Sequence, residues 1–336
     1  MVTLDEILKP SELEKLKKAA HPNFLKPMLA TLTEDYFDDP TWIYERKLDG
    51  VRCLVSIKNG KVRLYSRNAN EMTNSYFELP KILRESGYKN LIADGEIVAF
   101  EGKTTSFSKL QGRIQLQDKE KLQNTKIKIH LYLFDILYYD SYLLGDLPLR
   151  IRKKILKKVI DWNNNIRYTT HRNAKGKEFL EKACNKGWEG VIAKDALGTY
   201  VNSRSRKWLK FKCSLGQELV IGGFTEPQGE REGFGAMLVG FYKDGNLHYA
   251  GKVGTGFNDS FLQKWRSEFN KLTQKESPFK NFKDTAGGRN HWIKPKYVGQ
   301  FGFTEWTKNN KLRHPTFLGM RNDKNPLEVV KETSLE

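Results

Sequence analysis

The 336-residue chain carries 58 lysines and arginines against 40 aspartates and glutamates, a formal net charge of +18 at pH 7. This length predicts about two domains, and the charge predicts a polyanionic partner, with nucleic acid favoured because no basic amphipathic helix marks a membrane anchor. Three distant cysteines without a C-x-x-C pair argue against a zinc site or a disulfide framework, and the lack of long apolar runs argues against membrane spans and a secretory signal, so we expect a cytoplasmic protein.

The N-terminal residues 1–26 are predicted to form a helical extension to the first domain. Pro10 is suited to the first turn of a helix, and Ser11 with Glu14 has the spacing of a capping box. A short extended lead-in follows before the first domain.

Residues 27–212 mix strand and helix signals, which predicts an α+β domain. Asn59-Gly60 separates two alternating segments and predicts a hairpin closed by a type I′ turn. Ile129–Tyr139 is apolar almost throughout, as is typical of a strand buried on both faces. The other expected elements are the strands Leu91–Phe100, Val191–Ala193 and Trp208–Lys212 and the helix Glu178–Lys186, which Gly187 stops.

A helix is expected from Pro148 to Trp162. Its apolar residues predict a face toward the core, formed by Leu149, Leu156, Val159 and Ile160. The basic residues between them are interpreted as a solvated outer face that has some chance of touching nucleic acid, and they are Arg150, Arg152, Lys153, Lys154, Lys157 and Lys158.

Residues 213–330 change in character to short strands around a single helix. The helix is Asp259–Leu272 with Asn258 as its N-cap, and Lys243–Asn246 is a turn between two strands. The expected strands are Leu219–Phe224, Ala236–Tyr242, Leu247–Val253, Trp292–Lys294 and Phe301–Thr307. This size and pattern predict an OB-fold β-barrel, although an SH3-like barrel would give nearly the same pattern.

The octet Glu45–Arg52 contains the pattern K-x-D-G-x-R and comes just before the hairpin. We expect Lys47 to lie where a strand begins. A lysine held by ordered backbone, with an acid two residues on and an arginine five residues on, suits covalent catalysis on phosphate better than a solvated charge does. An amine attacks phosphorus only when it is unprotonated, and we expect neighbouring cations and a bound metal to depress the pKa of this lysine.

Five further motifs follow in the order of the chain. They contain cations, carboxylates and aromatic residues, and they are Ser66-Arg67-Asn68 with Asp94-Gly95-Glu96, Phe134-Asp135, Glu189–Lys194, Arg206–Lys212 and Arg313–Lys324. Alternation in Arg206–Lys212 places Lys210 and Lys212 on one face of a strand and Leu209 and Phe211 on the other.

Taken together, these motifs resemble those of the covalent nucleotidyltransferases, which comprise ATP-dependent DNA ligases, RNA ligases and mRNA capping enzymes. The resemblance implies an α+β adenylation domain with antiparallel sheets and flanking helices, followed by an OB-fold barrel. It implies that Lys47 is the nucleophile that takes the nucleotide as a phosphoramidate. It also implies that Glu45 accepts a hydrogen bond from the adenine amino group, that Phe134 stacks on the purine and that Ile192 belongs to the nucleotide-binding set.

The same resemblance assigns the remaining site residues. Phosphate contacts are implied for four cations, which are Arg52, Arg67, Lys210 and Lys212. The metal, Mg²⁺ or Mn²⁺, is implied to bind through Glu96, which also contacts the ribose, and through Glu189. In the barrel, Asp323 and Lys324 end the last motif and are implied to be catalytic.

Finer matches narrow the resemblance to the ligase module of bacterial ligase D. They include Pro27–Ala30, Leu143–Arg150, Gly198-Thr199-Tyr200 and Phe303–Thr307, within a span of about 24 to 330. This implies ATP-dependent sealing of nicked or broken duplex DNA in non-homologous end joining. It implies a monomer in the bacterial cytoplasm, associated with the nucleoid, with a Ku-type end-binding protein and polymerase and phosphoesterase modules as partners and no membrane.

Two rival functions remain open at this stage. One is a capping-type enzyme that uses GTP, and the other is a catalytically inactive nucleic-acid-binding protein in which the motifs are relics. An NAD-dependent ligase is disfavoured because the chain lacks the four-cysteine zinc site of that family.

Overall fold

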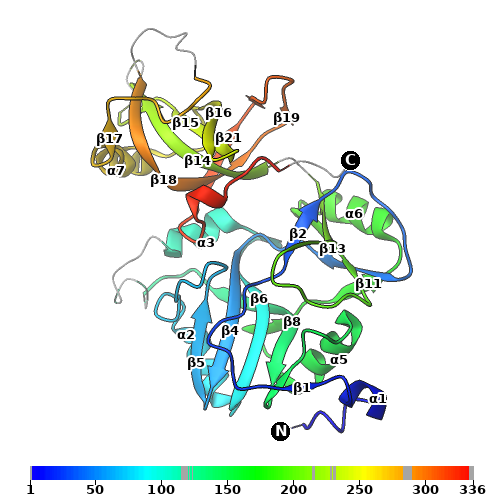
Figure 1. The fold of residues 1–336 in the computed structure, drawn as a ribbon. Helices are drawn as coiled ribbons and strands as arrows, with labels where there is room; N and C mark the ends of the chain where they lie inside the picture. The colour runs from blue at the N-terminus through cyan, green and yellow to red at the C-terminus, as the bar shows by residue number, and fades with distance from the viewer. Residues whose placement is uncertain are drawn as a thin grey trace. The chain divides into compact units, whose positions relative to one another are not determined.

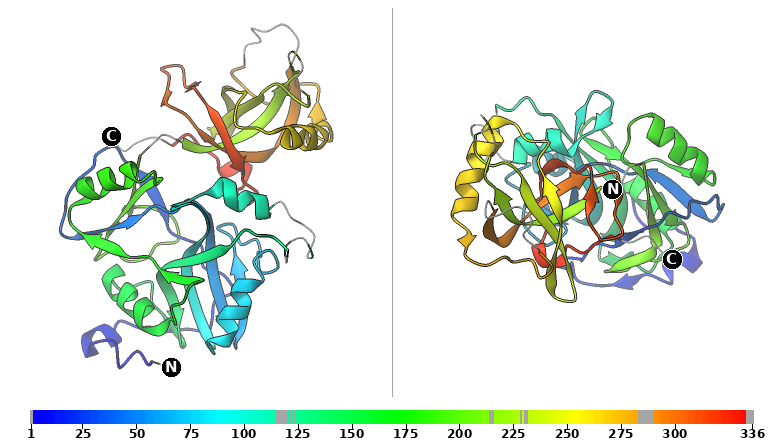
Figure 2. Two further views of the ribbon diagram at one scale, coloured as in Figure 1. Left: turned by 180° about the vertical axis from the view of Figure 1, so that it is seen from behind. Right: turned by 90° about the horizontal axis from the view of Figure 1, so that it is seen from above.

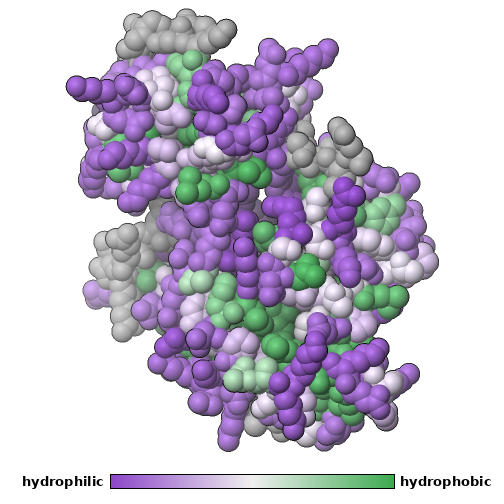
Figure 3. Space-filling view, viewed as in Figure 1, coloured by the Kyte–Doolittle hydropathy of each residue, from purple (hydrophilic) through white to green (hydrophobic). Residues whose placement is uncertain are grey.

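A computed structural model describes residues 2–332, apart from 115–119, 121, 123, 214–215, 228, 230–231 and 283–289. The chain divides into two compact units, one running to Cys213 and the other ending at Glu332, and each is described by itself (Figure 1). No helix in the described part of the chain is long and apolar enough to cross a membrane. Hydrophilic residues cover most of the surface visible in Figure 3.

The larger sheet of the first unit has eight strands in the order β1-β9-β8-β6-β4-β5, with β10 beside β8 and β7 beside β6. All pairings are antiparallel except that of β10 with β8. The strands are β1 Lys17–Lys18, β4 Val51–Lys58, β5 Lys61–Tyr65, β6 Asn90–Glu101, β7 Thr104–Thr105, β8 Ile129–Tyr139, β9 Tyr142–Leu143 and β10 Ile166–Tyr168. Asn59 and Gly60 both have positive φ between β4 and β5, which confirms the predicted type I′ hairpin.

A second sheet in the same unit has the order β11-β3-β12-β13-β2. Its strands are β2 Leu29–Leu32, β3 Trp42–Arg46, β11 His171–Asn173, β12 Gly190–Asp195 and β13 Arg204–Lys212. Lys47 follows the end of β3 and precedes β4 by four residues, so the expectation that it stands at the start of a strand is wrong. The tight connection from one sheet to the other passes through this lysine.

Helices cover the outer faces of both sheets (Figure 2). In the larger sheet, alternate residues of β4 such as Val51 and Val55 enter a core with Leu79, Leu110 and Leu156 from α2 (Glu78–Glu85), α3 (Phe107–Ile114) and α5 (Leu149–Val159). In the second sheet, Tyr44, Val191 and Phe211 pack beneath α6 (Gly176–Asn185). The residues that alternate with these point to the opposite faces, where the motif side chains lie.

The N-terminal helix is shorter than expected and differs in its cap. α1 spans only Pro10–Leu13, and the Lys9 amide donates a hydrogen bond of 2.8 Å to Glu12 in place of the predicted box of Ser11 with Glu14. Glu12 is the third residue of the helix, and from this position a carboxylate reaches the backbone amide of the N-cap residue, here Lys9.

The cysteine prediction is wrong for one pair. Cys184 near the end of α6 and Cys213 just after β13 form a disulfide with a Cα–Cα distance of 5.2 Å, although 29 residues separate them in sequence. The packing of α6 on its sheet brings these two chain positions together, which cysteine spacing alone does not indicate. Cys53 is buried and free.

The second unit is a sheet of six strands, β16-β15-β14-β18-β17 with β21 beside β18, and it contains the helix α7. Its elements are β14 Gly216–Thr225, β15 Met237–Lys243, β16 Asn246–Val253, α7 Asp259–Asn270, β17 Thr273–Gln274, β18 Asn290–Gly302, β19 Glu305–Trp306, β20 Leu312–Arg313, β21 Thr316–Met320 and the 3₁₀ turn η1 Pro326–Glu328. The Asn258 cap is confirmed, since its side chain accepts from the Phe261 amide at 2.9 Å.

One strand assignment in this unit changes. The two predicted strands Trp292–Lys294 and Phe301–Thr307 are joined, because the single strand β18 includes the first and the start of the second. Between the described strands, the pairings form an open path from β16 to β17 and do not close the barrel.

Candidate active site

The second sheet brings Glu45, Ile192 and Lys210 into one row. Ile192 of β12 pairs with Glu45 of β3 on one side and with Lys210 of β13 on the other. Direct partners on antiparallel strands project to the same face, which here is the face opposite α6. Three predicted site residues that are up to 165 positions apart in the sequence therefore lie side by side.

Lys47 extends this face by one step. Its amide donates to the carbonyl of Gly190 at 2.9 Å, and Gly190 is the register partner of Lys212. A Cβ at Gly190, where φ is +148°, would lie 2.1 Å from the Phe211 carbonyl oxygen, so only glycine permits this close approach. The glycine of the E-G pair thus fixes the distance between the Lys47 backbone and β13.

The connection after Lys47 is held just as tightly. The Asp49 carboxylate accepts from the Phe107 amide at 2.9 Å, while the Asp49 amide donates to the hydroxyl of Thr105 at 3.1 Å. A Cβ at Gly50 would lie 2.2 Å from the Ile97 carbonyl oxygen. The D-G pair of the motif therefore anchors the lysine loop against β6 and β7 and the start of α3.

The Lys47 ammonium group forms an ion pair with Glu189, and both side chains remain partly exposed, at 17% and 28%. Burial by itself lowers the pKa of Lys47, but attraction by Glu189, their hydrogen bond, and the charges of Asp49 and Glu96 outweigh it, so the pKa lies above its ordinary value. The neighbours that act on Lys47 here are carboxylates, and the expected lowering of its pKa by a bound metal stays a prediction. Attack by this amine requires both loss of a proton and release from Glu189.

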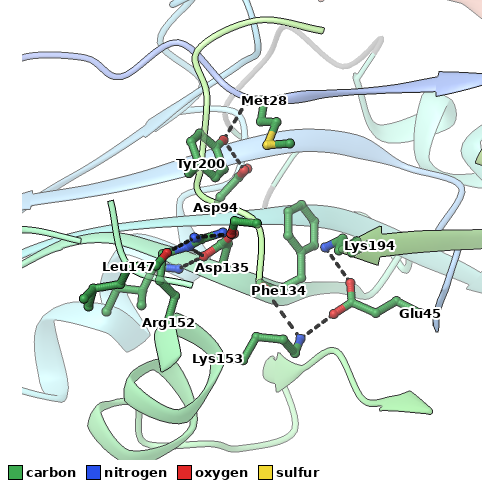
Figure 4. A network of polar contacts seen from close by, with 12 residues as sticks. Met28, Glu45, Asp94, Phe134, Asp135, Leu147, Arg152, Lys153, Lys194 and Tyr200 are labelled. Atoms are coloured by element: carbon green, nitrogen blue, oxygen red, sulfur yellow. Dashed lines mark hydrogen bonds and ion pairs between the residues drawn. The ribbon is translucent and has the colours of Figure 1, made fainter. Parts of the chain in front are cut away.

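Arg52 projects from β4 on the inner face of the larger sheet, opposite Glu96 of β6. Its guanidinium group forms two hydrogen bonds of 2.6 Å with Asp94. Asp94 also accepts from the Tyr200 hydroxyl at 2.6 Å (Figure 4). A third bond of 3.1 Å reaches the Met28 carbonyl. This bidentate pair fixes the position of the Arg52 side chain. Its contact with phosphate stays a prediction.

Phe134 of β8 is enclosed between the two sheets and is only 8% exposed. Its ring centre lies 4.2 Å from the Lys194 nitrogen, 4.8 Å from the Arg52 guanidinium carbon and 6.0 Å from the ring centre of Trp208. Cations over an aromatic face are attracted by its negative quadrupole. The ring therefore marks the place where side chains of both sheets meet, and its stacking on a purine stays a prediction.

The outward assignment of Arg152 and Lys153 is wrong, because both side chains are buried, at 0% and 2% exposure. Arg152 forms bonds of 2.7 and 2.9 Å with Asp135 and one of 3.1 Å with the Gly198 carbonyl, while Lys153 binds Glu45 (Figure 4). They stand three and four residues after the buried Leu149, which is the spacing of one helix stripe. This spacing indicates that Arg152 and Lys153 are buried, although their charge favours an exposed position.

Arg152→Leu is expected to lower the free energy of unfolding by about 3–5 kcal/mol, because it leaves the Asp135 carboxylate buried without its cation. Denaturant unfolding of the variant measures this loss. Lys154→Leu changes an exposed position of the same helix and serves as the control. Equal stability of the two variants would show that Asp135 does not depend on Arg152.

The remaining predicted residues are Arg67 in the first unit and Asp323 and Lys324 in the second. Arg67 is half-buried in the turn after β5. Asp323 and Lys324 belong to the second unit, where Asp323 forms bonds of 2.9 and 2.8 Å with Arg321, and Lys324 lies 2.9 Å from Glu218. Burial by itself raises the pKa of Asp323, but the attraction and hydrogen bond of Arg321 outweigh it, so the pKa is lowered.

The donor set near Lys47 suits a hard divalent cation. Glu189 forms an ion pair with Lys47, and the charge of Glu96 also acts on the same ammonium group. The described residues contain no group of three or more histidine, cysteine or acidic side chains arranged to hold a metal. Magnesium binds through one or two carboxylates, with water and phosphate as its other ligands, so these two side chains fit it.

Two family models match the chain. Residues 27–212 match the ATP dependent DNA ligase domain, and residues 230–324 match the ATP dependent DNA ligase C terminal region.

Curated relatives share about a third of their residues with the chain. The multifunctional non-homologous end joining protein LigD of Pseudomonas aeruginosa is 34% identical over 94% of this chain and 37% of its own length. LigD of Mycolicibacterium smegmatis is 32% identical over 95% and 41%. A DNA ligase of Methanococcus aeolicus is 30% identical over 89% and 55%. The chain thus spans about two fifths of the length of these LigD proteins.

One solved structure is similar over nearly the whole chain. A mycobacterial DNA ligase D complexed with ATP and MES has 30% identity and a TM-score of 0.66, and the match covers 92% of this chain and 98% of that one. The α+β first unit and the OB-fold class of the second agree with these matches.

Proposed function

The chain belongs to the ATP-dependent DNA ligase family, and on that premise we propose that it seals DNA breaks through an adenylate carried on Lys47. The observation that carries the proposal is the position of this amine. It stands at the junction of the two sheets, paired with Glu189 and on the face shared with Lys212. Such a cluster combines a nucleophile, carboxylates for a metal and cations for phosphate.

The proposed reaction has three steps. The Lys47 nitrogen bonds to the α-phosphorus of ATP as the bond to pyrophosphate breaks, and the amine gives up a proton. The adenylate then passes to the 5′-phosphate of a break, which restores the lysine. Finally the 3′-hydroxyl attacks that phosphate, AMP leaves, and a phosphodiester bond remains. Lys210 and Lys212 offset the phosphate charge throughout.

Glu96 and Glu189 would hold Mg²⁺ or Mn²⁺, which when bound neutralises charge on the phosphates and competes with Lys47 for the Glu189 carboxylate. Glu189 would therefore bind the Lys47 ammonium group in the metal-free protein and the metal when it is present. Its release from the ammonium group removes one of the interactions that keep the pKa of Lys47 high. In the nucleotide-free protein the raised pKa keeps the Lys47 amine protonated.

Asp323 and Lys324 are proposed to act in the first step only. Pyrophosphate departs in line only when its phosphates are oriented opposite the attacking nitrogen, and an ammonium group can supply that orientation. We propose that the hinge for this role lies near Cys213-Ser214-Leu215-Gly216, and two of these residues, Ser214 and Leu215, lie outside the described part of the chain.

The biological setting is also proposed. The LigD relatives are named for non-homologous end joining, which supports a role in bacterial double-strand break repair. We propose nicked or broken duplex DNA as substrate, a monomer associated with the nucleoid, and a Ku-type end-binding protein and polymerase and phosphoesterase modules as partners. The LigD relative of Pseudomonas aeruginosa is much longer than this chain, which covers 37% of its length.

DNA binding is expected to weaken steeply with salt, because the formal net charge of +18 favours contacts with phosphate. The logarithm of the association constant should fall by about 0.9 per phosphate contact for each tenfold rise in salt. Fluorescence anisotropy with a nicked duplex at several salt concentrations measures this slope. A binding constant that does not change with salt would contradict the phosphate-based interface.

A sealing assay separates the candidate functions. A nicked duplex with a labelled 5′-phosphate should be joined when ATP and magnesium are present. If the protein is labelled covalently by GTP and not by ATP, the result would instead indicate the capping-type reaction. An absence of labelling with either nucleotide, together with retained DNA binding, would indicate a catalytically inactive binding protein.

A further inference from the structure

The Glu45 carboxylate is enclosed between two lysines from different parts of the chain. Its exposed fraction is 2%, as is that of each lysine. Lys153 of α5 donates a hydrogen bond to one oxygen, and the Lys194 nitrogen of β12 lies 2.6 Å from the other (Figure 4). A carboxylate held at both oxygens by buried cations has one orientation.

Lys153 is itself fixed by three acceptors. Its ammonium group has three N–H donors, and it contacts Glu45, the Thr169 carbonyl at 3.1 Å and the Phe134 carbonyl at 3.5 Å. These partners belong to β3, to the segment after β10, and to β8. One ammonium group thus joins the side chain of Glu45 to the backbone that carries the Phe134 ring.

We propose that Lys153 is a positioning residue that sets the preference for ATP over GTP, by holding Glu45 as a fixed acceptor for the adenine amino group. This inference rests on the proposed function, and it adds a residue from outside the six motifs. Adenine presents an N–H donor where guanine presents a carbonyl acceptor. An ionised carboxylate only accepts, so it attracts the first and repels the second.

The charge state of Glu45 agrees with this role. Burial alone raises the pKa of the carboxyl group, but attraction by Lys153 and Lys194, with their hydrogen bonds, outweighs it, and the pKa falls below its ordinary value. The group is therefore ionised at neutral pH. A buried carboxylate without such partners would take up a proton and become a donor as well as an acceptor, and its selectivity would then be lost.

The two lysines differ in what else they contact. The Lys194 nitrogen lies 4.2 Å from the ring centre of Phe134 and 4.0 Å from that of Trp208, so it also supports the aromatic cluster. Lys153 bonds oxygen atoms with all of its donors and lies 4.6 Å from the Tyr168 ring centre. Lys153 is therefore the better position at which to change the Glu45 contact without removing the cation that lies between the Phe134 and Trp208 rings.

Lys153→Met tests the proposal, because methionine keeps a straight apolar chain and removes the ammonium group. Self-adenylylation is measured with ATP and with purine riboside triphosphate, which lacks the 6-amino group, and the two kcat/KM values are compared. The wild type should prefer ATP, and the variant should lose about tenfold or more of that preference, mainly through KM, on the scale of one charge-assisted hydrogen bond. GTP should also label the variant better relative to ATP than it labels the wild type.

The ratio of two substrates on one preparation does not depend on the fraction of folded protein, so a purely structural role of Lys153 would leave it unchanged. Lys154→Met is the matched control on the same helix, and Lys153→Arg should keep the preference because it keeps the charge. If Lys153→Met does not fold, Lys153→Gln carries the same comparison. An unchanged ratio in a labelling-competent variant overturns this inference, whereas a wild type that labels with neither nucleotide overturns the proposed function.

Discussion

Lys47→Ala is expected to abolish labelling of the protein by ATP while leaving part of the sealing activity on nicks that already carry an adenylate. Only the first step forms a bond to the lysine nitrogen, so only that step and the transfer from it need the amine. Alanine has no atom that can take its place. The backbone conformation at residue 47 should be retained in the variant, because the amide of this residue donates to the Gly190 carbonyl and does not depend on the side chain.

Two assays on one preparation measure this separation. Labelled ATP reports adenylate on the protein, and a synthetic adenylylated nick reports the last step by itself. Lys58→Ala, at an exposed position of β4, is the control and should behave as the wild type in both assays. Labelling of Lys47→Ala would show that another residue is the nucleophile.

Glu189→Ala and Glu96→Ala should each lower the rate of self-adenylylation by about 10²-fold or more, the scale of losing one preorganised electrostatic contact. Both carboxylates act on Lys47 and both fit the metal, and Glu189 forms an ion pair with the lysine. Loss of Glu189 should therefore also lower the pKa of Lys47, because it removes the strongest of the attractions that raise it.

The pH profile distinguishes the two variants. In the wild type the rate should rise with pH as Lys47 loses its proton, and in Glu189→Ala the rise should be centred at lower pH. Higher magnesium concentration should restore part of the rate in both variants. Glu181→Ala on the exposed side of α6 is the control, and a Glu189→Ala enzyme with full rate would remove this residue from the site.

Much of the fold follows from local patterns in the sequence. The I′ hairpin at Asn59-Gly60, the buried strand Ile129–Tyr139 and the Asn258 cap are all confirmed, because each depends on neighbours within a few residues. The disulfide of Cys184 with Cys213 and the joining of two strands into β18 depend on packing between distant segments. Neither feature can be predicted from the residues nearby in the sequence.

The structure shows contacts of the predicted site residues that the sequence did not indicate. The resemblance named Lys47, Glu45 and Glu189, and the structure brings the first and last together as an ion pair. It did not indicate that Glu45 is held by Lys153, because a basic residue on a helix is usually solvated and only its position on the Leu149 stripe indicates burial. The raised pKa of Lys47 likewise depends on which carboxylate lies nearest, and this requires the folded chain.

The central claim is that Lys47 carries the adenylate, and mass spectrometry of the intact protein tests it most directly. After incubation with ATP and magnesium, we predict a mass increase of one adenylate, located by peptide mapping to the peptide that contains Lys47 and absent in Lys47→Ala. An unchanged mass, or an adenylate on a different residue, would contradict the account.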